Sequence, residues 1–316
     1  MSKKYEFTDE TTEVDGHTLH RIRAVRCFSD VKAGDFGGWI EKEHNLSHED
    51  HAWVYDEGKV YGNAQVIDDA RVCDCAKVYD NALIEDRARV YHHVQVYNDA
   101  SVSCDAEVGD NAMVYNHATV YDNALVCDNA KVYDFCCISG KAQVGDDAAV
   151  YGYASVCGCA LVGHQAKVCG NTYIYGNARI LDRAEVYDDT SVCSNAKVGG
   201  SALVFGNAHI AGGARIAGKA EVCGCANIGG GTEIAGKAEV CGLADYITFK
   251  NFWSSGRHFT WTRSNNMWRV GCFYGTGEEL IKKAYKDSEK SGREYERVVR
   301  YVESILADEK NEKEGE

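Results

Sequence analysis

The chain carries a six-residue repeat that runs without a break through most of its length. Starting at Val54 and stepping by six, every position through Val240 is Val or Ile, which makes 32 consecutive matches in 316 residues. The residue two places before each aliphatic is small, usually Ala, and the residue two places after it is nearly always Asp, Gly, Asn, Ser or His. A spacing of two puts the small and the branched residue on one face of a strand, and the third residue suits a turn. The repeat therefore predicts a solenoid of short strands and corners.

The residue directly after each aliphatic shows how many hexads make one coil. At steps of eighteen this column reads Tyr61, Tyr79, Tyr97, Tyr115, Tyr133, Tyr151, Cys169, Tyr187, Phe205, Cys223 and Cys241, whereas the other two sets of hexads show no such run. The environment thus repeats every three hexads, which predicts a three-sided coil and, at about 4.8 Å per coil, a solenoid roughly 50 Å long. The six tyrosines from Tyr61 to Tyr151 are either a stacking ladder within the solenoid or an apolar edge that a partner subunit covers.

Two kinds of segment resemble known proteins. The hexad Val-Gly-Asp-Asn-Ala-Met at 108–113 and its copies are similar to the repeat of the hexapeptide-repeat β-helix superfamily, which includes trimeric acyltransferases and gamma-class carbonic anhydrases. The segments at 30–40 and 52–56 resemble the opening of uncharacterised bacterial and phage hexapeptide proteins, one of which is named as an acetyltransferase. The resemblance implies a left-handed parallel β-helix with three hexads per coil. The uncharacterised relatives bring no established activity.

The sequence outside the repeat predicts two end domains. Residues 1–51 alternate apolar and polar residues over 18–26, which predicts an N-terminal β cap on a β-helix of residues 52–245. The glycine-rich stretch 34–38 is interpreted as a tight turn, because no Gly-Lys-Ser/Thr follows it. Residues 246–309 predict three strands, at 246–252, 258–263 and 267–273, then a helix from Thr276 and a second helix after Gly292. From Ala307 the charged chain is expected to fray, with residues 310–316 as a separate tail. The fold class is thus an all-β solenoid with an N-terminal cap and a small C-terminal β+α domain.

Composition limits the compartment and the partners. No stretch approaches the roughly 18 consecutive apolar residues of a membrane helix, and the first residues lack a signal peptide, so we expect a cytoplasmic protein. The fifteen cysteines are interpreted as reduced thiols. The net charge of −14 argues against general binding to nucleic acid or to anionic membranes.

Histidines are the candidate catalytic residues if the acyltransferase activity of the superfamily applies. Such enzymes use a histidine as general base and bind acyl-CoA between the prisms of a trimer. His92, His117 and His164 are the weak candidates, with acetyl-CoA as the cofactor of this alternative, but no loop interrupts the hexads. A gamma-type carbonic anhydrase needs three histidines for zinc, two of them close in sequence, and the spacing His-x4-His does not occur. The sequence therefore predicts no metal site and, outside the acyltransferase alternative, no cofactor.

Acidic residues gather in the first half of the repeat. Residues 56–147 contain 17 Asp and Glu against 7 Lys and Arg, a net charge of −10, whereas residues 148–245 contain 8 against 7. One corner column holds Asp56, Asp74, Asp110, Asp128, Asp146 and Asp182, with His92 and His164 in its other places, and neighbouring hexads add Asp80, Asp122 and Asp134. Stacked carboxylates repel one another by about 1 kcal/mol per pair at 4 Å even in water. The acidic residues are either good corner formers and nothing more, or a face that binds a basic partner.

The expected function rests on this acidic face. We expect a non-enzymatic binding or inhibitor protein, phage-encoded and acting in a bacterial host, that mimics nucleic acid and blocks a basic nucleic-acid-binding defence protein without binding nucleic acid itself. One alternative is a hexapeptide-repeat acyltransferase that uses acetyl-CoA. The other is a structural spacer or oligomeric rod. A homo-oligomer, either a dimer or a trimer, is also expected.

Overall fold

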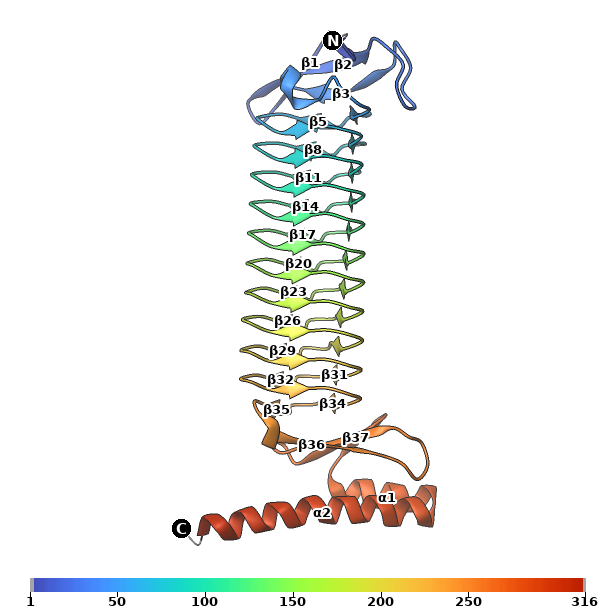
Figure 1. The fold of residues 1–316 in the computed structure, drawn as a ribbon, viewed down its shortest axis with the longest axis vertical. Coiled ribbons are helices and arrows are strands. Elements are labelled where there is room, and N and C mark those ends of the chain that lie inside the picture. The colour runs from blue at the N-terminus through green and yellow to red at the C-terminus, as the bar shows by residue number, and fades with distance from the viewer. Residues whose placement is uncertain (1–2, 315–316) are drawn as a thin grey trace.

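A computed structural model describes residues 3–314 as a long prism with a cap at one end and a small domain at the other (Figure 1). The prism begins with β4 (Trp53–Val54) and ends with β35 (Glu239–Val240), and a two-residue strand recurs every six residues between them. Each strand pairs in parallel with the strand eighteen residues further on, as Val114 does with Val132. The strands fall into three sheets. The predicted three-sided coil of eighteen residues is therefore confirmed.

The repeat builds the prism because each hexad position has one environment. The Val and Ile side chains and the small residues two places before them point inward, and nearly all are fully buried. Every corner residue from Asp56 to Gly236, two places after each aliphatic, has a positive φ between 51° and 76°. Asp, Asn and Gly tolerate this left-handed backbone better than other residues, which explains their place in the repeat.

The N-terminal cap extends one face of the prism. Strands β1 (Tyr5–Val14), β2 (His17–Ala24) and β3 (Phe36–Ile40) pair in antiparallel order, and β3 then pairs in parallel with β5 (Lys59–Val60). A short 3-10 helix, η1 (Glu43–Asn45), follows β3. The predicted turn over residues 34–38 is right only for Gly34, whose φ is +96°. Gly37 and Gly38 lie in β3, and a side chain at either place would collide with the first coil, which explains why both are glycines.

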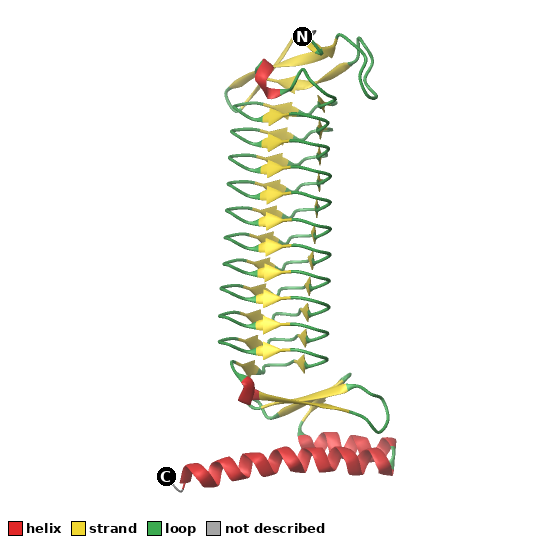
Figure 2. Ribbon diagram, in the orientation of Figure 1, coloured by secondary structure: helices red, strands yellow, loops and turns green. Residues whose placement is uncertain are grey.

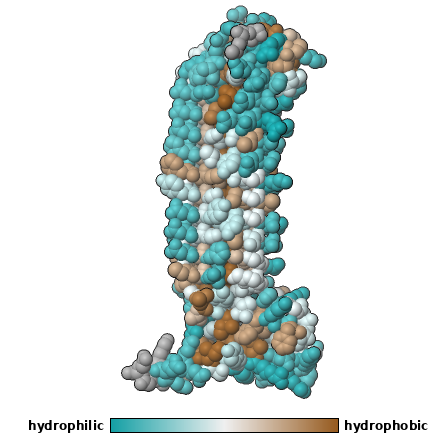
Figure 3. All heavy atoms as spheres, viewed as in Figure 1, coloured by the Kyte–Doolittle hydropathy of each residue, from teal (hydrophilic) through white to brown (hydrophobic). Residues whose placement is uncertain are grey.

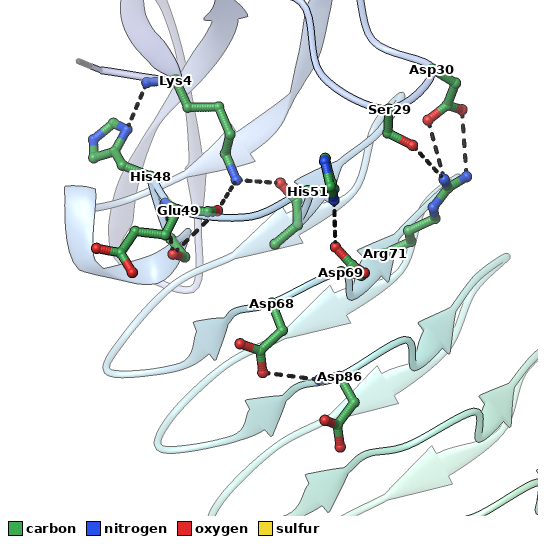
Figure 4. A network of polar contacts seen from close by, with 12 residues as sticks. Lys4, Ser29, Asp30, His48, Glu49, His51, Asp68, Asp69, Arg71 and Asp86 are labelled. Atoms are coloured by element: carbon green, nitrogen blue, oxygen red, sulfur yellow. Dashed lines mark hydrogen bonds and ion pairs between the residues drawn. The ribbon is translucent and has the colours of Figure 1, made fainter. Parts of the chain in front are cut away.

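A buried lysine closes the first coil (Figure 4). Lys4 Nζ donates to the carbonyl oxygens of Glu49 and Ala52 at 3.1 and 2.8 Å. Burial, helped by the nearby charge of Arg26, lowers the pKa of this amine to about 8. The contact satisfies carbonyl groups at the open end of the solenoid, where no preceding coil can donate to them.

The C-terminal domain is a four-stranded antiparallel sheet and two helices, drawn in yellow and red in Figure 2. After η2 (Leu243–Asp245), its elements are β36 (Tyr246–Lys250), β37 (His258–Thr262), β38 (Met267–Val270), β39 (Phe273–Gly275), α1 (Gly277–Asp287) and α2 (Glu289–Glu314). Phe259, Trp261 and Trp268 are buried in its core, whereas Phe252 is 82% exposed.

Three predictions about this domain are wrong. The sheet has a fourth strand, β39, because the predicted strand at 267–273 is interrupted by a turn at Gly271, whose φ is +56°. The second helix begins at Glu289 instead of after Gly292, which lies within α2 where α1 packs so closely that a β-carbon would collide with the ring of Tyr285. Helix α2 also continues through the charged residues from Ala307 to Glu314 that were expected to fray. Arg263, the residue directly after β37, forms a bidentate ion pair with Glu309 of α2. This pair holds the end of the helix against the sheet.

Candidate functional site

The corner aspartates form hydrogen-bonded columns along the prism. Oδ2 of Asp110 accepts the backbone N–H of Asp128 at 3.3 Å, Oδ2 of Asp128 accepts that of Asp146 at 3.0 Å, and Asp146 accepts that of His164 at 2.8 Å. The same bond to the corner residue of the next coil is made by Asp68, Asp74, Asp80, Asp86, Asp122, Asp134, Asp182 and Asp188. Figure 4 shows it between Asp68 and Asp86. Asp56 has the same left-handed backbone at the start of its column.

These bonds offset the repulsion between stacked carboxylates. The backbone N–H of Asp146, followed by the Cys127 thiol, lowers the pKa of the Asp128 carboxyl. The backbone N–H of Gly200, with a smaller effect of His164, lowers the pKa of Asp182. Because both folded-state values are depressed, the stability they contribute is present above the unfolded pKa of about 3.9 and is lost as the pH falls through the folded values.

We expect Asp128→Ala to lower the free energy of unfolding by about 2 kcal/mol, measured by urea denaturation. The change removes an inter-coil hydrogen bond and places alanine in the left-handed region, and each effect is worth about 1 kcal/mol. Asp128→Asn is the matched control, because Asn98 and Asn116 already occupy corners with positive φ. Equal stability of the alanine variant and the natural protein would contradict the structural role of this carboxylate.

Each candidate histidine is paired with an aspartate one coil away. His92 Nδ1 lies 3.0 Å from Asp110 Oδ1, and His164 Nδ1 lies 3.1 Å from Asp182 Oδ1. His117 Nδ1 lies 3.7 Å from Asp99 Oδ2. A carboxylate hydrogen-bonded to an imidazole is the arrangement of a general base, and the pair of His92 and Asp110 has it. His164 Nδ1 also accepts the backbone N–H of Asp182 at 3.1 Å, and the 3.7 Å between His117 and Asp99 is too long for a hydrogen bond. The sequence contained the signal, because each pair is eighteen residues apart.

Two surface grooves adjoin these histidines. A groove of about 620 Å³ includes His117, Asp99 and the ring of Phe135, and a groove of about 520 Å³ includes His164 and Asp182. His92 lines neither groove. The three histidine side chains are each about half exposed, at 51 to 55%. The structure thus places the three candidates on different coils and does not bring them together in one site.

The aromatic edge is a stacked ladder. The ring centroids of successive tyrosines lie 4.9 to 5.1 Å apart, and their planes differ by no more than 5°. The ladder contains Tyr61, Tyr79, Tyr97, Tyr115, Tyr133 and Tyr151. A second stack, which sequence reasoning missed, joins His117, Phe135 and Tyr153 at 4.7 and 5.2 Å. Tyr153 is 65% exposed. Burial of the tyrosine ladder between subunits stays a prediction.

The interpretation of all cysteines as reduced thiols is wrong at one pair. Cys223 and Cys241 are joined in a disulfide, because the eighteen-residue period stacks them in one column with their Cα atoms 4.4 Å apart. Together with Glu239 they form one of two groups whose ligand atoms lie within 4.8 Å of one another. The other group is Asp110, Cys127 and Asp128. The disulfide engages both sulfurs of the first group, and a hydrogen bond from the Cys127 thiol to Asp128 accounts for part of the second.

The charged residues lie on the outside of the prism. Figure 3 shows hydrophilic residues along the borders of the visible prism face over most of its length. No helix within the described residues 3–314 is long and apolar enough to cross a membrane.

Comparison with known proteins gives one short similarity. The chain is 43% identical over 42 residues to the protein named "Uncharacterized acetyltransferase YdcK" of Escherichia coli (strain K12), and the match covers 13% of each chain. The matched part is therefore a small fraction of that relative's length. No protein-family profile matches the chain. The chain is a three-sided β-solenoid with coils of eighteen residues, and this architecture and the weak similarity to an acetyltransferase agree with a hexapeptide-repeat β-helix.

Proposed function

We propose that the protein is a non-enzymatic binding protein whose acidic half-prism holds a basic, nucleic-acid-binding partner. The observation that carries this proposal is the charge density of residues 56–147, which have a net charge of −10. These residues fill about five coils, or roughly 25 Å at 4.8 Å per coil, so about one net negative charge falls on every 2.5 Å. Double-stranded DNA carries one charge per roughly 1.7 Å of its axis.

The rigidity of the carboxylates supports the same function. Each bonded corner aspartate has Oδ2 held by the next coil, as in Asp110, Asp128 and Asp146, which fixes the side chain and its charge along the column. The acidic corners belong to all three edges, since Asp68 and Asp86, Asp80 and Asp134, and Asp110 and Asp128 follow strands of different sheets. A rigid rod with negative charge around it suits a groove built for a nucleic-acid backbone.

The test is capture of a partner from bacterial lysate, with a charge variant and a matched control. We expect the immobilised protein to retain a nucleic-acid-binding protein that double-stranded DNA elutes. The triple change Asp110→Asn, Asp128→Asn and Asp146→Asn should abolish retention, because asparagine keeps the corner conformation but removes the charge. The control triple, Glu185→Gln, Asp188→Asn and Asp189→Asn, changes the nearly neutral half and should retain the partner. Retention by the first triple in 1 M salt would show that the acidic face is not the cause.

An acetyltransferase is the second candidate, favoured by the name of the similar relative and by the His117–Asp99 pair beside the larger groove. Here His117 would act as the general base and acetyl-CoA would be the acyl donor. Calorimetric titration with acetyl-CoA separates the two functions. Binding at micromolar concentration that His117→Ala removes would support the enzyme and contradict the non-enzymatic proposal.

A further inference from the structure

A cavity of about 430 Å³ lies where the last coils of the prism meet the C-terminal sheet. Arg215 of β31 (Arg215–Ile216) and Glu233 of β34 (Glu233–Ile234) line it from the prism, and Arg257, His258 and Arg269 line it from the C-terminal domain. Strand β34 contacts both β37 and β38, so the cavity is formed by the docking of the two parts. Its volume lies within the range of small-molecule sites, roughly 300 to 1,000 Å³.

The cavity is positively charged in a strongly acidic protein. Arg269 Nε donates to Glu233 Oε2 at 3.0 Å, and Arg215 Nη1 lies 3.8 Å from Glu233 Oε1. Arg257 forms no ion pair within the part of the chain that the structure describes. The Glu233 carboxylate contacts two of the three guanidinium groups but balances only one positive charge, so the cavity keeps an excess of two positive charges. A phosphate-bearing ligand would supply the missing negative charge.

Two glycines make room for the side chains of Arg257 and His258 beside the cavity. A β-carbon on Gly271 would lie 3.2 Å from Arg257 Nη1, and one on Gly231 would collide with the imidazole ring of His258. Both glycines line the same cavity. A side chain at either place would push Arg257 or His258 out of its position beside the cavity.

A strip of basic residues leads along the prism to the cavity. Arg179, Lys197 and Arg215 are direct cross-strand neighbours, and all three are exposed. Like charges directly opposite one another destabilise a sheet, and neither Arg179 nor Lys197 has an ion pair among residues 3–314. No aromatic residue interrupts this strip from Arg179 to Glu233. The strip therefore offers no ring on which the bases of a nucleic-acid strand could stack. A small anion suits this surface better than a nucleic-acid strand does.

We propose that this cavity binds the diphosphate group of a small anionic ligand. Arg257 and Arg269 have the forked guanidinium groups that bind phosphate oxygens in pairs, and His258 can donate a further hydrogen bond. Arg215 closes the prism side of the site, and Glu233 holds Arg215 and Arg269 in place. The inference is independent of the acidic face, which lies in the opposite half of the prism.

The test is calorimetric titration of the full chain with sodium pyrophosphate at low ionic strength. We expect binding with a Kd below about 1 mM, weakened at least about tenfold by Arg257→Gln, because one charge-assisted contact is worth roughly 1.4 kcal/mol or more. Arg183→Gln is the matched control, since Arg183 is an exposed arginine of the same half that does not line the cavity. Arg257→Lys keeps the charge and should recover part of the affinity.

Two results of this titration would overturn the proposal. One is the absence of pyrophosphate binding, and the other is an equal affinity of the Arg257→Gln and Arg183→Gln variants for pyrophosphate. Tighter binding of a single-stranded DNA oligonucleotide than of pyrophosphate, with loss of that binding in Arg179→Gln, would assign the basic strip to nucleic acid. Circular dichroism of each variant verifies its fold, and Arg257→Gln should keep the natural unfolding midpoint, since its side chain forms no ion pair among the described residues.

Discussion

Val114→Asp is expected to prevent the prism from folding. Val114 is fully buried in the middle of the solenoid, and the side chains above and below it in its column, Val96 and Val132, are buried aliphatics as well. An unpaired carboxylate there costs several kcal/mol, which is comparable with the whole stability of many proteins, about 5 to 15 kcal/mol. Because each coil pairs only with its neighbours, the damage also separates the two halves of the prism. Circular dichroism during thermal unfolding measures the loss.

Met113→Asp is the control for this prediction. Met113 is the adjacent residue of the same strand, β14 (Met113–Val114), but its side chain points outward. Its cross-strand neighbour Lys131 can form an ion pair with the new carboxylate. We therefore expect the free energy of unfolding to change by no more than about 0.5 kcal/mol. Similar unfolding midpoints for the two variants would contradict the assignment of the inward face.

Gly152→Val is expected to cost about 3 kcal/mol or more. Gly152 is a corner residue with φ of +72°, a conformation that a β-branched residue adopts only with strain. A β-carbon at this position would lie 3.0 Å from the backbone nitrogen of Gly170, so the two further methyl groups of valine would press on the next coil. Urea denaturation of the variant beside the natural protein gives the difference in free energy.

Gly152→Asn tests whether backbone conformation causes that cost. The preceding corners of this column are Asn98, Asn116 and Asp134, all with positive φ, so asparagine should cost no more than about 1 kcal/mol. If valine and asparagine are equally destabilising, crowding of the β-carbon and not the left-handed backbone sets the cost.

The sequence predicted most of the prism because the contacts that build it recur at one spacing. The eighteen-residue period correctly placed Tyr97 beside Tyr115, and it also contained the pairs His92 with Asp110 and Cys223 with Cys241, which were not recognised. The eighteen-residue period does not show which atoms of neighbouring coils are in contact. The carboxylate oxygen of Asp128 reaches the N–H of Asp146 only because the left-handed corner turns both groups toward each other.

The sequence by itself thus determined the three-sided prism, its corners and the columns of tyrosine and aspartate, since residues in neighbouring coils occupy equivalent positions in every repeat. Only the tertiary structure decided the fourth strand of the C-terminal sheet, the start of α2 and the basic cavity. Arg215, Arg257 and Arg269 belong to segments that share no period, and they meet because the C-terminal sheet docks on β34. Such contacts depend on how two surfaces pack, and the spacing of residues along the chain does not encode that packing.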